Sequence, residues 1–431
     1  MNFYSLNKQA PSVSFKEAVI AGIAPDKGLY FPERITPLPS TFFNRIEELS
    51  NQEIAFTAIH QFVNENLTDE ALKEILAAML DFEFPVVAIE ENVGTLELFH
   101  GPTMAFKDVG ARFMANCLGH FSKGNKEEVT VLVATSGDTG GAVANGFLGV
   151  KGVNVVILYP SGKVSEIQEK QLTTLGQNIN AIEVNGTFDD CQKMVKTAFL
   201  DKEITAKKKL TSANSINVAR WLPQLFYFLF AYKQAKSKGK EIVFSIPSGN
   251  FGNVCAGMVA QQLGMPVTHF IAATNVNDTV PKYMVNGTYH PKPSTATISN
   301  AMDVGDPSNF VRIRNIYNND FKKLKENLSS FSFNDATTKE AMESIYKNTR
   351  YICDPHGAVG YLGLKKYQEN NPNTYGVFLE TAHPVKFLDV VKETLKINLE
   401  IPPQIQKVMN KQKSSTKLST YQELKSYLLD A

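Results

Sequence analysis

Short β-branched runs alternate with helix-forming stretches from residue 128 onward, and this alternation restricts the fold more than any other feature. The first run, EVTVLVA at residues 128–134, ends in a turn and is followed by the small-residue stretch GGAVANGFLG. Two further runs, VNVVILYPSG at 153–162 and INAIEVNG at 179–186, are each followed by a helix-forming stretch. Because parallel strands are joined through crossovers of this length, the pattern predicts βαβ units and a parallel sheet.

A second set of the same kind begins with EIVFSIP at residues 241–247 and continues at 267–275 and 374–380. A long helix, expected around residues 217–236, separates the two sets. The predicted fold class is therefore α/β, with two wound open sheets and flanking helices.

Residues 1–90 differ from the rest, because their apolar residues recur at three-to-four spacing, as in DEALKEILAAMLDF. This spacing predicts a mostly helical N-terminal domain. A chain of 431 residues is too long for one compact core. We therefore expect two α/β domains to follow, at 91–236 and 237–431, the second ending in C-terminal helices. The polar stretch 403–420 is expected to be a mobile linker to the last helix.

Charge and cysteine content argue against several classes of function. Lys and Arg total 44 against 43 Asp and Glu, a net charge of +1, which recommends neither a nucleic-acid nor a membrane partner. The four cysteines lie far apart, and the N-terminus shows no basic region followed by an apolar run. We therefore expect a cytoplasmic protein. The histidines show no metal-ligand spacing, so no metal is expected.

The loop ATSGDTGG, residues 134–141, leaves a predicted strand and opens a predicted helix. Unpaired backbone N–H groups at a helix start attract an anion. The hydroxyls of Thr135, Ser136 and Thr139 add donors, and Gly137 lets a ligand approach the backbone closely. A plain strand-to-helix turn with a capping Asp or Ser is the alternative interpretation.

The loop PSGNFGN, residues 247–253, follows another strand and also precedes a helix. It matches neither the dinucleotide pattern nor the nucleoside-triphosphate pattern. Its N–H groups and the side chains of Ser248, Asn250 and Asn253 can still surround one phosphate. Thr381 lies just past a third strand, where its hydroxyl can meet a ligand atom or merely cap a helix.

Lys107 stands in the apolar stretch LELFHGPTMAFKD, where a helix is expected to begin. Burial and the positive end of a helix both disfavour the ammonium and lower its pKa. A neutral amine can form a Schiff base with an aldehyde and afterwards act as a base. Considered alone, a surface lysine beside Asp108 is the simpler interpretation.

A further polar segment, SANSINVAR, places Asn214, Ser215 and Asn217 before a helix that carries Arg220. Amide, hydroxyl and guanidinium donors suit a second anion, although a capping box with a surface Arg is the alternative. A Schiff-base lysine, one phosphate loop and a second anion segment together indicate an enzyme that uses pyridoxal 5'-phosphate.

Several long motifs make the chain resemble the threonine synthase family, in its longer bacterial and fungal branch. They include LELFHGPTMAFKD, TSGDTGGAVA, IPSGNFGN and FLETAHPVKF, and the similarity runs nearly end to end. The resemblance implies the tryptophan-synthase-β-like fold of the fold-type II pyridoxal phosphate enzymes. It also implies a lyase, monomeric or homodimeric, that converts the small molecule O-phospho-L-homoserine and water to L-threonine and phosphate in the last step of threonine biosynthesis.

The resemblance further implies roles for individual residues. Lys107 would form the Schiff base with the cofactor and carry protons, and Thr381 would face the pyridine nitrogen. The cofactor phosphate would be held by Gly249, Asn250, Phe251, Gly252 and Asn253. The substrate would be bound by Thr135, Ser136, Gly137 and Thr139 at its carboxylate, and by Asn214, Ser215 and Arg220 at its phosphate. Asp138 stands near the ring hydroxyl where the wider fold commonly has Asn, so its protonation and its bond to the ring are open.

Two alternative functions remain at this point. Another fold-type II lyase, such as a serine/threonine dehydratase or a phospho-amino-acid lyase, would share Lys107 and the phosphate loop but differ at the second anion segment. A non-catalytic metabolite-binding relative is the other alternative, and the intact Lys107 and Thr381 argue against it. His100 and His356 lie in family-like segments, where core, capping and site-lining roles are all open.

Overall fold

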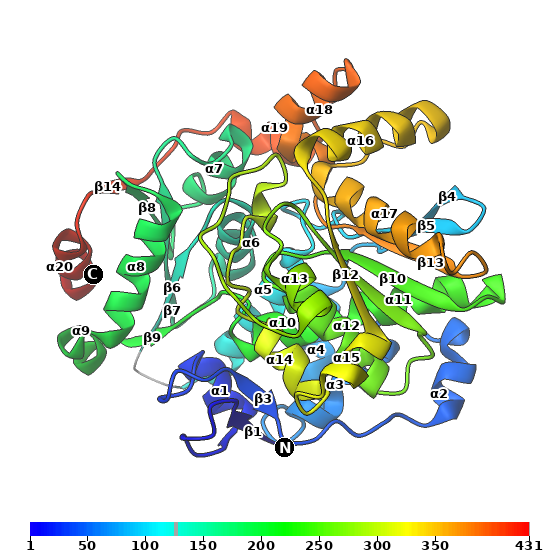
Figure 1. The fold of residues 1–431 in the computed structure, drawn as a ribbon. Helices are drawn as coiled ribbons and strands as arrows, with labels where there is room; N and C mark the ends of the chain where they lie inside the picture. The colour runs from blue at the N-terminus through cyan, green and yellow to red at the C-terminus, as the bar shows by residue number, and fades with distance from the viewer. Residues whose placement is uncertain (125–127, 431) are drawn as a thin grey trace.

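A computed structural model describes residues 1–124 and 128–430, and its strands form three sheets (Figure 1). Two large sheets lie on either side of the centre of the molecule, and a small one lies near the N-terminus. The two wound α/β sets predicted from the alternating pattern are confirmed by these two large sheets.

The first large sheet has five parallel strands in the order β14-β8-β7-β6-β9. The strands are β6 (Val129–Ala134), β7 (Val153–Pro160), β8 (Ile179–Val184), β9 (Lys209–Thr211) and β14 (Thr416–Leu418). Its three central strands are almost wholly buried, because helices cover both faces. One face packs against α5 (Lys107–Phe121) and α6 (Asp138–Phe147), and the other against α8 (Phe188–Leu200) and α20 (Tyr421–Asp430).

The second large sheet has six strands in the order β12-β11-β10-β13-β5-β4. The strands are β4 (Val86–Glu90), β5 (Val93–Glu97), β10 (Ile242–Pro247), β11 (His269–Thr274), β12 (Leu328–Ser332) and β13 (Tyr375–Glu380). All neighbours are parallel except the edge pair β4 and β5. Helix α17 (Pro355–Gln368) packs on one face, and α11 (Leu225–Ala235) and α12 (Gly252–Gln262) on the other.

Sheet membership does not follow a division of the chain at residue 236. Strand β5 belongs to the second sheet although it precedes all strands of the first, and β14 returns near the C-terminus to pair with β8. The domain ranges 1–90, 91–236 and 237–431 therefore remain predictions. The range 91–236 contains β5, a strand of the second sheet, and the range 237–431 contains β14, a strand of the first.

The N-terminal region contains strands as well as the predicted helices. The helices are α1 (Phe15–Ala21), α2 (Ser40–Asn44), α3 (Asn51–Val63) and α4 (Asp69–Met79). Strands β1 (Asn2–Ser5), β2 (Val13–Ser14) and β3 (Tyr30–Pro32) form an antiparallel sheet. These strands have two to four residues each, too few for an alternating pattern to be recognised in the sequence.

The segment expected to be one long helix at 217–236 is interrupted. Helix α10 (Val218–Trp221) is followed by a 3₁₀ turn, η2 (Leu222–Gln224), and only then by α11. Pro223 lies in that turn and offers no N–H for a helical hydrogen bond, which explains the break. The apolar stretch around it is buried in the core, and within the described ranges no helix has the length and apolar character needed to cross a membrane.

The C-terminal segment is ordered by contacts with the first sheet. Residues 403–420, expected to be a mobile linker, contain α19 (Pro403–Met409) and β14. The expectation was wrong because it rested only on the polarity of the stretch. In the structure, part of the segment pairs with β8 as a parallel strand. The remaining elements are α7 (Glu166–Thr173), α9 (Lys202–Lys207), α13 (Thr279–Asn286), α14 (Phe310–Ile316), α15 (Phe321–Asn327), α16 (Asp335–Thr349), α18 (Leu388–Leu395) and the short turns η1 (Ile46–Glu48), η3 (Lys236–Lys238), η4 (Asn300–Met302) and η5 (Pro384–Phe387).

Candidate active site

A cavity of about 480 Å³ lies where the carboxyl ends of β6, β10 and β13 meet. This is the position at which parallel sheets commonly bind ligands. The predicted site residues that line it are Lys107, Thr135, Ser136, Thr139, Asn214, Ser215, Arg220, Gly249, Asn250, Phe251, Gly252, Asn253 and Thr381. Gly137 and Asp138 do not line it. The tertiary structure thus brings five segments that are far apart in the sequence to one cavity.

Lys107 is the first residue of α5, and the loop before it is fastened to the end of β13. The Phe106 N–H donates to the Thr381 carbonyl at 2.8 Å, and the His383 N–H donates to the Met104 carbonyl at 3.0 Å. These two bonds hold the start of α5 next to the residue that follows β13. The predicted helix start at Lys107 is confirmed.

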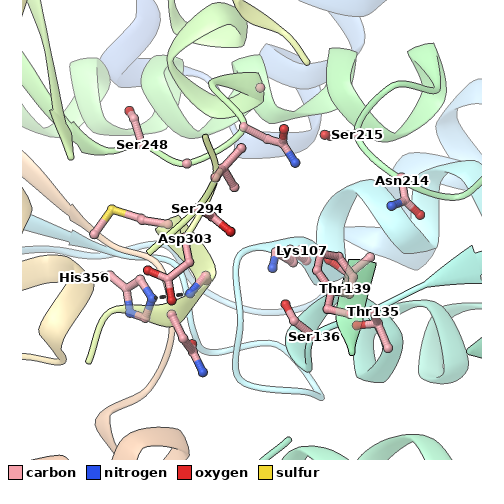
Figure 2. A pocket seen from close by; sticks show the side chains of 18 of the residues that line it. Lys107, Thr135, Ser136, Thr139, Asn214, Ser215, Ser248, Ser294, Asp303 and His356 are labelled. Atoms are coloured by element: carbon pink, nitrogen blue, oxygen red, sulfur yellow. Dashed lines mark hydrogen bonds between the residues drawn. The ribbon is translucent and has the colours of Figure 1, made fainter. Parts of the chain in front are cut away.

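The Lys107 side chain is half-buried and lines the cavity (Figure 2). Burial is the largest effect on its pKa and lowers it; the Asp138 charge opposes this, and the charges of Lys386 and Arg220 reinforce it. In the described part of the chain, no carboxylate forms an ion pair with the Lys107 ammonium. A lysine held in this way favours the neutral, nucleophilic amine.

The loop before α6 is shaped by Thr135 and Gly137. The Thr135 hydroxyl accepts hydrogen bonds from the N–H groups of Gly137 at 3.0 Å and Gly140 at 2.8 Å, so it is engaged within the loop. Gly137 has φ 143°, and a Cβ there would lie 2.5 Å from the Gln168 side chain. Ser136 and Thr139 are the less buried hydroxyls, and Figure 2 shows both on the same side of the cavity as Lys107.

The loop between β10 and α12 brings backbone N–H groups to the cavity at the helix N-terminus. A Cβ on Gly249 would lie 2.7 Å from the Ala301 carbonyl oxygen, so the close approach of these two segments requires glycine. Phe251 adopts the left-handed conformation with φ 60°, held by packing of its ring against Phe310 at 5.7 Å. Asn253 is 8% exposed, and both polar atoms of its amide lack a hydrogen-bond partner.

The segment before α10 presents a second group of donors. Arg220 is 4% exposed; its Nη1 donates to the Ala213 carbonyl, while its Nε has no partner. Burial lowers the pKa of Arg220 to about 10, which leaves the guanidinium charged at neutral pH. The Asn214 amide oxygen is also buried without a partner. A buried guanidinium whose Nε–H donor has no partner, at the wall of a cavity, is suited to an anionic group carried by a ligand.

Lys386 is a residue that sequence reasoning missed. It lies in η5, its side chain has no exposed surface, and it forms an ion pair of 2.7 Å with the Asp138 carboxylate. Although burial alone would raise the pKa of Asp138, the charges of Lys386 and Lys107 lower it well below its usual range. The ion pair with Lys386 and the lowered pKa both favour the carboxylate form of Asp138. Lys386 stands in the motif FLETAHPVKF, but no spacing rule connects it with Asp138.

His356 and the loop 294–304 also contribute to the cavity wall (Figure 2). The His356 Nδ1 pairs with the Asp354 carboxylate at 2.7 Å, and its Nε2 accepts the Ala301 N–H at 3.2 Å. His356 thus supports the loop that packs over Gly249. His100 does not line the cavity and instead pairs with Glu97 at 2.7 Å.

The cavity fits pyridoxal 5'-phosphate in the chemistry of its donors. The partnerless Asn253 amide and the glycine-dependent loop at Gly249 suit a phosphate at the N-terminus of α12. The Lys107 amine suits an aldehyde, and the Thr381 hydroxyl lines the same cavity. The Arg220 Nε, which has no hydrogen-bond partner, remains available to donate to a second anion.

Comparison with protein families gives three matches along the chain. A model described as pyridoxal-phosphate dependent enzyme matches residues 94–379. Models described as threonine synthase N terminus and threonine synthase, C-terminal match residues 2–79 and 357–428. The three together span nearly the whole sequence.

Individual proteins give the same result. The threonine synthase of Escherichia coli is 44% identical over 94% of this chain and 94% of its own length. That of Buchnera aphidicola (strain APS) is 40% identical over all of both chains, and that of Saccharomyces cerevisiae is 36% identical over 89% of this chain and 87% of its own.

Solved threonine synthase structures are similar over nearly their full length as well. A threonine synthase crystal structure from Escherichia coli superposes with a TM-score of 0.93 at 41% identity, covering 100% of both chains. A threonine synthase from Brucella melitensis, described as bound to PLP, has a TM-score of 0.93 at 30% identity, covering 99% of this chain and 98% of its own. A tomato threonine deaminase, at 17% identity and TM-score 0.56, covers 77% of this chain and 94% of its own, and shares the fold.

Proposed function

The chain belongs to the threonine synthase family of pyridoxal-phosphate-dependent lyases, and we propose that its cavity converts O-phospho-L-homoserine and water to L-threonine and phosphate. One observation carries the proposal: the Lys107 amine shares a cavity with two separate groups of anion-binding donors, at 249–253 and at 214–220. A cofactor phosphate and a substrate phosphate require two such groups.

Pyridoxal phosphate, when bound, supplies an electron sink for negative charge that develops next to the α-carbon of an amino acid. We assign Lys107 to the covalent attachment of the cofactor, and the loop 249–253 to its phosphate. Thr381 is assigned to the pyridine nitrogen. A hydroxyl there carries no negative charge, so it does not favour a proton on that nitrogen as a carboxylate would.

The substrate is assigned to the other two segments. Ser136 and Thr139 lie at the N-terminus of α6, where hydroxyl and backbone donors suit the substrate carboxylate. Arg220 suits the substrate phosphate because its buried Nε–H has no partner, and the Asn214 side chain, whose NH₂ is a donor, lines the same cavity. A fixed guanidinium also stabilises the charge that grows on the phosphate as it leaves.

Proton transfers are assigned to the Lys107 amine. Its pKa is lowered by burial, which brings the amine closer to the range in which a base works well at neutral pH. The two charges of the ion pair between Lys386 and Asp138 act on this pKa in opposite directions. One water is needed for addition to the substrate.

A serine/threonine dehydratase would use Lys107 and the loop 249–253 in the same way. It would have no second phosphate to bind. The partnerless Nε of the buried Arg220 therefore favours a phosphorylated substrate over a dehydratase reaction.

The test compares Lys107→Ala with Lys151→Ala, a variant of an exposed lysine in the turn before β7. We expect Lys107→Ala to lose the visible absorbance of protein purified with pyridoxal phosphate, and to release no phosphate from O-phospho-L-homoserine. Lys151→Ala should retain both. Threonine formation by Lys107→Ala at near wild-type rate would contradict the assignment. Ketoacid formation from threonine by the wild type, without phosphate release from phosphohomoserine, would favour the dehydratase.

A further inference from the structure

Lys386 is held in one position by three contacts with the surrounding chain. Its ammonium contacts the Asp138 carboxylate at 2.7 Å and donates to the Thr103 carbonyl at 2.8 Å. The 3₁₀ turn that carries it is closed by a bond from the Lys386 N–H to the His383 carbonyl at 3.0 Å. Because Thr103 lies in the loop before Lys107, Lys386 connects that loop with the start of α6.

Asp138 is fixed from the opposite side. The Gln168 amide donates to the same carboxylate oxygen at 3.0 Å, and the Asp138 side chain is 6% exposed. Ser165 in turn donates its N–H to the Gln168 side chain at 3.3 Å. The carboxylate therefore has a fixed place as well as a fixed partner.

The charges around Lys107 come from four elements. Asp138 on α6 favours the ammonium form of Lys107, whereas Lys386 on η5 and Arg220 on α10 disfavour it. Asp108, next to Lys107 on α5, accepts bonds from the N–H and hydroxyl of Thr103. Burial raises the pKa of Asp108, while its bonds with Thr103 and the charges of Lys386 and Arg112 oppose this rise. Burial lowers the pKa of His383, beside Lys386, to about 4, and the charges of Glu97 and His100 have smaller effects on it.

This arrangement decides which lysine neutralises Asp138. With Lys386 in place, the Asp138 carboxylate has a buried cation at ion-pair distance. Among the described residues, Lys107 has no carboxylate at that distance. If Lys386 lost its charge, Lys107 would be the nearest remaining cation that Asp138 favours, and a buried carboxylate without a partner strongly stabilises a neighbouring positive charge.

We propose that Lys386 is a positioning residue that neutralises the Asp138 carboxylate, so that this carboxylate does not hold the Lys107 nitrogen in its protonated form. The inference rests on the proposed function, in which that nitrogen binds the cofactor and moves protons. Lys386 acts through Asp138 and does not line the cavity. A purely structural ion pair would stabilise the fold without affecting proton binding at Lys107, and this difference can be measured.

The experiment uses Lys386→Met, which removes the charge, and Lys386→Arg, which keeps it. In the protein with bound cofactor, the pH at which the visible absorbance changes reports proton binding at the Lys107 nitrogen. We expect Lys386→Met to raise this midpoint by about 1–3 pH units, the size of effect that a nearby opposite charge produces. Lys386→Arg should stay close to the wild type.

The double variant Lys386→Met/Asp138→Asn completes the test. Removing both charges should return the midpoint toward the wild-type value, and should give a higher Tm than Lys386→Met alone, because one buried charge without its partner is worse than none. A wild-type midpoint in Lys386→Met, or a raised midpoint that persists in the double variant, would overturn the proposal. If the wild type itself showed no visible absorbance with pyridoxal phosphate, the proposed function would fail, and the order of the two Tm values would still decide whether Lys386 and Asp138 act as a pair.

Discussion

The Asn309 amide donates a hydrogen bond of 3.1 Å to the Ser215 hydroxyl, while the Asn309 N–H donates to the Asn250 carbonyl at 3.1 Å. One residue therefore joins the segment assigned to the substrate phosphate with the loop assigned to the cofactor phosphate. Arg312 strengthens this joint, because its Nη1 donates to the Ser215 carbonyl at 3.0 Å and its guanidinium lies 4.4 Å from the centre of the Trp221 ring.

Replacing Asn309 with Ala should weaken substrate binding, because Ser215 loses the bond that orients its hydroxyl. A hydrogen bond of this kind contributes about 1 kcal/mol, so we expect KM for phosphohomoserine to rise by about fivefold. Steady-state kinetics measure the change. The matched control is Asn370→Ala, at an exposed position outside the site. Equal KM values in the two variants would show that Ser215 needs no support from Asn309.

Gly249→Ala should reduce affinity for pyridoxal phosphate. The added Cβ would lie 2.7 Å from the Ala301 carbonyl oxygen and 2.9 Å from the Met302 Cα, and both are backbone atoms that cannot move alone. Losing one bond to a charged phosphate costs about 1.5–3 kcal/mol, so Kd should rise at least about tenfold. Titration of the visible absorbance measures Kd.

A glycine in α5 provides the control for this variant. A Cβ on Gly119 would meet only the end of the Val150 side chain, at 3.1 Å. Gly119→Ala should leave cofactor affinity unchanged, since alanine is favoured within a helix. Unchanged affinity in Gly249→Ala as well would place the cofactor phosphate elsewhere.

Arg220→Ala should raise KM for phosphohomoserine while the visible absorbance of the cofactor is retained. The buried guanidinium has an Nε without a partner, and a bond to a charged group contributes about 1.5–3 kcal/mol, which corresponds to roughly 10- to 100-fold. Arg220→Lys should recover only part of this loss, because it restores the charge without the Nε donor. The control is Arg34→Ala, an exposed arginine. Loss of cofactor from Arg220→Ala would assign this residue to the other phosphate.

Glu183 should control the docking of the C-terminal segment. It forms an ion pair with Lys413 at 2.8 Å and accepts a bond from Ser161 at 2.6 Å. Burial would raise the pKa of Glu183, but these partners lower it to about 2. Because the folded pKa lies below the unfolded one, the contribution to stability is present above about pH 4.3 and is lost as the pH falls toward 2.

The measurement for Glu183 is limited proteolysis of the stretch 410–420. Cleavage there should increase in the wild type as the pH falls from 5 to 3, and Glu183→Gln should already be cleaved at neutral pH while retaining activity. Glu340→Gln, an exposed substitution beside the other large sheet, should behave as the wild type. A protected segment in Glu183→Gln would mean that the β14–β8 pairing alone holds it.

The wound sheets and the loops at their strand ends could be predicted from the sequence. Strand–helix alternation is a local property, and loops such as 134–141 and 247–253 follow strands that are recognisable by their β-branched residues. The apolar context and helix start of Lys107 are also local, but considered alone they leave a surface lysine as the simpler interpretation, and the anion loops and the family motifs are needed to favour a reactive amine. All three features depend on residues within a few positions of one another.

The features that could not be predicted depend on contacts between distant positions. The pair Asp138 and Lys386 is separated by more than half the chain, and no periodicity relates the two residues. The strand β14 is recognisable only from its partner β8, and the loop at Ala301 only from the His356 and Gly249 that it contacts.

The sequence by itself determined which residues can do chemistry here, because side-chain type, helix starts and turn-forming glycines are local and read directly from the chain. Only the tertiary structure decided how these residues act on one another. The state of Lys107 depends on how deeply it is buried and on which cation neutralises Asp138, and both follow from packing α5, α6 and η5 together. Electrostatic energy depends on distance in space and on exclusion of water, and neither is a property of position along the chain.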